Sequence, residues 1–99
     1  MKIKRNKWMS ADELITIIDS CMKNDYETAL IIIRENLDKT DSKRTTDLWM
    51  MIYGFVVAFM EDYTKAIDIF NTLIDTIEPE RAKLLCQEGI HICNKMRFE

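Results

Sequence analysis

One short motif occurs twice in this chain, and the distance between its two copies limits the folds the chain can adopt. Residues 25–29 read Asp-Tyr-Glu-Thr-Ala, and residues 62–66, 37 positions later, read Asp-Tyr-Thr-Lys-Ala. Each copy follows a short apolar stretch with helical spacing and begins another, so the repeating unit is predicted to be a helix, a tight turn and a second helix. A period of this length is typical of helical repeat arrays. Such arrays bind other chains far more often than they catalyse reactions.

The composition supports a single all-α domain. The chain has 99 residues, of which 47% are hydrophobic and 31% are charged, as in an ordinary globular domain. It contains only two glycines and one proline. An all-β fold of this size would need more turn residues than that, so we expect about five helices in antiparallel hairpins.

Five helices are predicted from capping residues and apolar spacing. Ser10 with Glu13 forms a capping box at the start of the first helix, and Asp25 and Asp62 are N-caps of the second and fourth. Residues 39–44 are polar and without periodicity, so they are predicted to form a loop, with Thr45 or Thr46 capping the third helix. Pro79 is placed in the first turn of the fifth helix, a position that tolerates proline. The predicted helices cover about residues 10–22, 25–37, 46–60, 62–77 and 79–97.

The charge distribution indicates the class of partner, and the cysteines indicate the cellular compartment. The net charge is −3 and the isoelectric point about 5.2, which argues against nucleic acid. Residues 1–9 hold four cations and are predicted to be a basic, solubilising N-terminal tail ahead of a single domain at 10–99; a phosphate or lipid contact is the alternative. Three cysteines, none in a Cys-x-x-Cys pair, indicate a reducing compartment, and no secretory segment is visible. We expect a soluble, cytoplasmic protein.

The side chains that carry catalytic or metal chemistry are sparse. His91 is the single histidine, and with Cys86 and Cys93 it does not share one helical face. The acidic pairs at Glu61-Asp62 and at Glu78 and Glu80 lie at predicted helix starts, where carboxylates are favoured electrostatically. We therefore expect neither an enzyme nor a bound metal or cofactor.

The second helical hairpin resembles a tetratricopeptide repeat. With the Asp-Tyr turns aligned, Gly54 and Ala66 fall on the family's small positions, Phe70 on its aromatic position, and Trp49 or Met50 on the early aromatic position. The closing proline of the family is one place late, at Pro79.

The first hairpin matches the family less well, because Ile17 stands at a small position and Glu13 at a large apolar one. The resemblance covers about residues 10–97 and implies two units followed by a C-terminal capping helix, in which Gly89 lies 35 residues after Gly54. A helical bundle that carries two Asp-Tyr turns by chance is the alternative.

The stretch 48–60 stands out because none of its thirteen residues is charged. It is too short to cross a bilayer, which takes about 20 residues, and a helix apolar on all sides must be covered on all sides. In the family that this chain resembles, the first helix of each unit lines a concave groove. The resemblance therefore implies a hydrophobic groove for an amphipathic helix, lined by Leu14, Ile18, Met22, Leu48, Met51, Phe55, Ala58 and Phe59, with Ala11 and Cys21 at further groove positions. The alternative is that these residues are core, closed over by the fifth helix.

The expected function is that of a protein-binding adaptor or chaperone. The chain's size, acidity and apolar groove are similar to those of the small type III secretion chaperones, which sequester a needle subunit and commonly act with a second small helical protein. A homodimer that packs through the 48–60 helix is one alternative, and a regulatory protein of a phage or virus is another.

Overall fold

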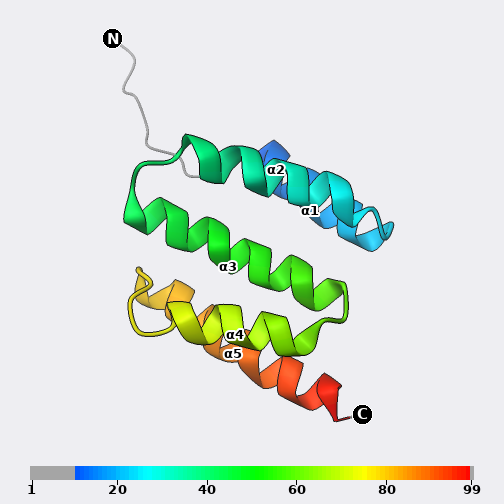
Figure 1. Ribbon diagram of the computed structural model, residues 1–99, viewed down its shortest axis with the longest axis vertical. Coiled ribbons are helices and arrows are strands. Elements are labelled where there is room, and N and C mark those ends of the chain that lie inside the picture. Colours follow the sequence, from blue (N-terminus) through cyan, green and yellow to red (C-terminus); the bar gives the residue numbers. More distant parts are fainter. Residues whose placement is uncertain (1–10, 99) are drawn as a thin grey trace.

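The computed structural model describes residues 11–98, and over that range its regular secondary structure consists of helices joined by short turns and loops (Figure 1). The predicted basic tail at 1–9 and the predicted cap Ser10 lie outside the described residues. The all-α fold of about five helices is confirmed. The helices are α1 (Ala11–Met22), α2 (Tyr26–Lys39), α3 (Lys43–Phe59), α4 (Tyr63–Leu73) and α5 (Glu80–Arg97).

The backbone repeats with the 37-residue period of the sequence. Helices α2 and α4 begin 37 residues apart, as do α3 and α5, and α1 and α3 end 37 residues apart. As a result α1, α3 and α5 run in one direction, and α2 and α4 run in the other (Figure 1).

The two Asp-Tyr turns have the same hydrogen bonds. Asn24 and Glu61 adopt left-handed backbone angles, with φ of 61° and 68°. The Asp25 amide donates to the Ser20 carbonyl at 2.7 Å, and the Asp62 amide donates to the Val57 carbonyl at 3.2 Å. These bonds close a Schellman motif at the end of α1 and of α3. Each aspartate carboxylate then accepts from the amide three residues on, at 3.3 Å, and so caps the next helix as predicted.

Several helix boundaries differ from the prediction, among them the end of α2, which lies at Lys39 and not at about residue 37. Helix α3 begins at Lys43, because the Ser42 hydroxyl accepts from the Thr45 amide at 3.3 Å and caps the helix three residues earlier than expected. Helix α4 ends at Leu73, although Ile77 beyond it is still buried. Pro79 is the N-cap of α5 and so lies just outside the helix.

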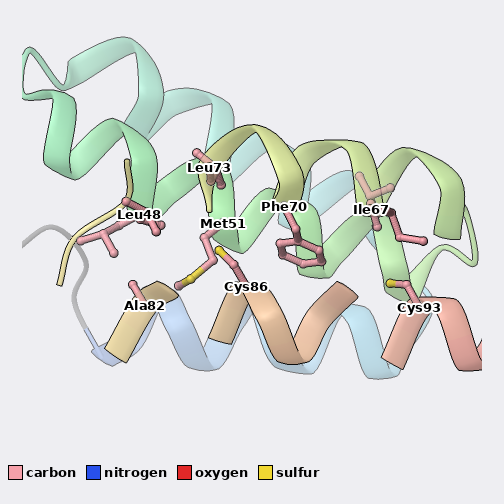
Figure 2. Close-up of a cluster of buried hydrophobic side chains, with 11 residues drawn as sticks. Leu48, Met51, Ile67, Phe70, Leu73, Ala82, Cys86 and Cys93 are labelled. Carbon is pink, nitrogen blue, oxygen red and sulfur yellow. The ribbon is translucent and has the colours of Figure 1, made fainter. Parts of the chain in front are cut away.

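The core consists of two clusters of buried side chains that share α3. The larger cluster joins α3, α4 and α5, and eight of its eleven buried residues are labelled in Figure 2. The smaller cluster joins α1, α2 and α3 through six buried residues, among them Ile17, Ala29 and Trp49. Figure 1 shows the consequence: α3 lies between the α1–α2 hairpin and the α4–α5 hairpin.

In the larger cluster, α3 and α5 both pack closely against the ring of Phe70 from α4. A Cβ atom added at Gly54 would lie 2.8 Å from that ring, and one added at Gly89 would lie 2.7 Å from it. Phe70 is fully buried, so its ring fills the space that the two glycines leave open on α3 and α5.

The first hairpin carries different side chains at the positions equivalent to Gly54 and Phe70. Ile17 and Ile33 stand 37 residues before Gly54 and Phe70, and both are buried in the smaller cluster. The polar Glu13 has a structural role as well, because its carboxylate accepts a hydrogen bond from the side-chain Nδ2 of Asn36 at 2.9 Å and so links α1 to α2. Where the first unit differs from the second, one residue of α1 and one residue of α2 therefore differ together.

Candidate functional site

The predicted groove residues fall into two groups in the structure. Four of them are exposed, and Phe55 and Ala58 are half-buried; the exposed ones are Leu14, Ile18, Met22 and Phe59. These positions are accessible to a partner, and their role in binding one stays a prediction. The side chain of Ala11 lies outside the described residues.

The other group is a correction, because three predicted groove positions are core. Leu48 and Met51 are 7% and 4% exposed and belong to the larger buried cluster, and Cys21 is buried in the smaller one. Helix α3 packs against α2, α4 and α5, and this packing covers Leu48 and Met51. The apolar surface that does remain on α3 lies at its C-terminal end.

An apolar pocket of about 300 Å³ opens at that end of the molecule. Three predicted groove residues, Phe55, Ala58 and Phe59, form its α3 side. Tyr63 at the start of α4 and Gly89 and Cys93 on the buried face of α5 also line it. Two exposed apolar side chains of α5, Ile92 and Met96, complete the pocket.

The sequence prediction missed Ile92 and Met96, although the 37-residue period identifies them. Phe55 and Phe59 are followed 37 residues later by Ile92 and Met96, and preceded at the same distance by two of the exposed residues of α1. Each of the three helices that run in the same direction therefore carries two apolar residues at equivalent positions, one helical turn apart. We call this set the apolar ladder: Ile18, Phe55 and Ile92 in one row, and Met22, Phe59 and Met96 in the other.

Most of the apolar ladder is open to solvent. Phe59 is 51% exposed, and Ile18, Met22, Ile92 and Met96 are exposed to a similar or greater extent. Phe55 differs, because its ring packs against Phe70 with the ring centroids 4.9 Å apart. Phe55 is thus anchored in the core at one edge and lines the pocket at the other, which leaves Phe59 as the most accessible ring of the site.

The polypeptide around Phe59 is held in place from the first hairpin. The hydroxyl of Tyr26 lies 3.1 Å from the Phe59 carbonyl oxygen and 2.9 Å from the Asn24 side-chain oxygen, so it is placed to donate to either acceptor. This contact joins the α1–α2 turn to the end of α3. The backbone beneath the exposed ring is therefore fixed even though the ring itself is accessible.

The two cysteines and the histidine of α5 differ in burial and so in reactivity. Burial raises the pKa of the Cys86 thiol to about 11, with a smaller contribution from Asp47, and burial also raises the pKa of Cys93. Both thiols are therefore protonated near neutral pH, and a protonated thiol is a poor nucleophile. His91 is exposed on α5. Among residues 11–98 no three His, Cys, Asp or Glu side chains are grouped so that they could hold a metal ion.

Comparison with known proteins returns no match: no protein-family model fits the sequence, and no curated protein or solved structure is significantly similar to it. The helices of the described range are also too short or too polar to cross a membrane.

Proposed function

We propose that the protein binds an amphipathic helix of a protein partner along the apolar ladder, as an adaptor or chaperone rather than an enzyme. The observation that carries this proposal is the recurrence of exposed apolar side chains at equivalent positions of α1, α3 and α5. Large apolar side chains that gather on one exposed surface typically mark a site of protein interaction. An apolar pocket between two of these helices offers a place for an anchoring side chain of the partner.

The spacing of the ladder matches the spacing of side chains along a helix. Packed helices such as α3 and α5 lie about 8–10 Å apart, and a helix rises about 10.5 Å over seven residues. A partner helix that crosses from α3 to α5 would contact the ladder residues of α3 with one of its own residues. It would therefore contact those of α5 with a residue about seven positions further along. The proposed ligand is a helix whose apolar stripe repeats at this interval.

A chaperone role follows from the same contacts. A helix with such a stripe self-associates when it is free, and covering the stripe prevents that association. The narrower proposal, a needle-subunit chaperone of type III secretion, rests on the resemblance in the sequence. The three free thiols fit a reducing compartment, so we propose that the complex forms in the cytoplasm.

A homodimer built on direct contact between two α3 helices is less favoured. Phe59 in α3 and Met60, the C-cap residue after it, are exposed large apolar side chains, and the other large apolar residues of α3 are at least half-covered within the chain. Two side chains are too few to form the core of a stable dimer interface, which buries about 800 Å² per partner.

The test is a single charged substitution with a neighbouring control. Phe59→Asp should leave the circular dichroism of the free protein unchanged, because the ring is 51% exposed. It should weaken binding of a labelled helical peptide, about 18 residues long with leucines at heptad spacing, at least tenfold, because the new carboxylate must be desolvated. Met60→Asp is the matched control, since Met60 is 43% exposed and does not line the pocket.

Three results would contradict the proposal. Loss of the helical signal in Phe59→Asp would make Phe59 a core residue. Equal weakening by Met60→Asp would mean that any added charge reduces binding. Equal affinity for a peptide of the same composition in scrambled order would show that the surface does not recognise a helical stripe.

A further inference from the structure

A second recess lies at the opposite end of α3 and has a different chemical character. It is a cleft of about 1020 Å³ between the end of α2, the start of α3 and the start of α5, ends that lie on the same side of the molecule in Figure 1. It shares no lining residue with the apolar pocket. At this size it exceeds the volume of a typical small-molecule site and can receive several side chains of a polypeptide.

The rim of this cleft is basic, in a chain whose net charge is −3. Lys39, Arg44 and Arg81 line it, with Asp41 as the single acidic lining residue. All three cations are exposed, and within the described part of the chain no ion pair engages any of them. They are therefore available to pair with the charges of a ligand.

Two nearby charges do not offset this rim. Asp47 is buried in α3, and its carboxylate is 2.7 Å from the ammonium of Lys43, which balances its charge. Neither of these two residues lines the cleft. The charged side chains that line the cleft are therefore three cations and one carboxylate, that of Asp41.

The floor of the cleft is apolar. Leu85 is 45% exposed and lines the cleft. The cleft is also lined by the few exposed atoms of three buried residues, Leu48, Trp49 and Met51. An inorganic anion or a nucleic-acid backbone would leave this floor uncovered. A ligand that matches both the rim and the floor carries carboxylates beside aliphatic side chains.

We propose that this cleft binds an acidic, leucine-bearing segment of a protein partner, with carboxylates paired to Lys39, Arg44 and Arg81 and a leucine placed against Leu85. The inference does not depend on the apolar ladder, because the two sites are separate. The chain's own residues 1–9 are a poor match, since their four cations have the same sign as the rim. Charge complementarity therefore selects a partner's acidic segment as the occupant.

The experiment uses two synthetic peptides and the full-length protein. One labelled peptide carries alternating pairs of Glu and Leu, and the other has Lys in place of every Glu. The Glu peptide should bind, more weakly as salt rises from about 0.05 to 0.5 M, and the Lys peptide should not. Arg44→Glu and Arg81→Glu should each reduce the affinity for the Glu peptide about tenfold.

Controls separate this site from the alternatives. Arg34→Glu changes the net charge equally at an exposed position outside the cleft and should leave the affinity unchanged. Phe59→Asp should also leave it unchanged, which distinguishes this site from the apolar ladder. Several outcomes would overturn the inference: no binding of the Glu peptide, equal weakening by Arg34→Glu, tighter binding of a single-stranded oligonucleotide, or a concentration-dependent dimer that Arg44→Glu dissociates.

Discussion

At the scale of single residues, the ring of Phe70 and the two glycines that face it set the distances between three helices. The ring lies between Gly54 on α3 and Gly89 on α5, and neither position has room for a Cβ atom unless the ring moves. Phe70 is fully buried, so movement away from one glycine brings the ring closer to other core atoms. The two glycines are required here by the close approach of the ring and not by their backbone angles.

We expect Gly54→Ala and Gly89→Ala each to destabilise the protein. Overpacking a core typically costs about 1–3 kcal/mol, and the better helix propensity of alanine offsets up to about 1 kcal/mol of that. The net loss should be about 1–2 kcal/mol, measured by urea unfolding. In a protein that already carries Phe70→Leu, Gly54→Ala should lower the free energy of unfolding by less than it does in the parent. If either alanine variant is more stable than the parent, the ring is not confined as described.

At the scale of elements, α3 shows why a helix start can be hidden in a polar stretch. Its first two residues, Lys43 and Arg44, are exposed cations, so this part of the first turn carries no apolar periodicity. The cap itself is a single hydroxyl, that of Ser42, which accepts from the Thr45 amide. Thr46 is inside the helix, where its amide donates to the Ser42 carbonyl at 2.9 Å.

Ser42→Ala and Thr46→Ala should therefore have different effects on stability. Ser42→Ala removes the cap and should lower the free energy of unfolding by about 1 kcal/mol. Thr46→Ala should change it by no more than about 0.5 kcal/mol, because alanine is the better residue inside a helix. Both values come from chemical denaturation. The reverse order would make Thr46 the N-cap of α3, one of the two caps that the sequence predicts.

At the scale of the whole molecule, the core is divided about α3 into a larger and a smaller part. Eleven of the described residues are buried in the α3–α4–α5 cluster and six in the α1–α2–α3 cluster. In helical arrays each unit is stabilised by its own core and by the interface with its neighbour. The α1–α2 hairpin, with the smaller core, is expected to open more readily than the rest.

The three buried cysteines report this difference directly. Cys21 lies in the smaller cluster, and Cys86 and Cys93 lie in the larger one. Alkylation requires a thiolate, and burial raises the pKa of all three thiols, so labelling near neutral pH depends on local opening. Pulsed alkylation followed by mass spectrometry should modify Cys21 first. Simultaneous modification of all three would mean that the chain opens as one cooperative unit.

The sequence by itself determined the local structure of this protein. Both turns after α1 and α3, the aspartate caps and the 37-residue period depend on residues that are close together in the chain, so adjacent side chains carry the signal. The all-α class follows from the same spacing and from the scarcity of glycine and proline. Of the positions predicted to line a groove, Leu14, Ile18, Met22 and Phe59 are exposed, and their role in binding a partner stays a prediction.

Only the tertiary structure decided which apolar residues remain exposed. Leu48 and Met51 are uncharged apolar residues of α3 like Phe59, yet the first two are buried in the larger cluster, whereas Phe59, the last residue of the helix, is 51% exposed. Ile92 and Met96 join the pocket because α5 packs beside α3. The three cations of the second cleft lie on three different helices, and the packing of these helices brings them to one cleft. Burial depends on what packs against a side chain, and that information is distributed over the whole chain.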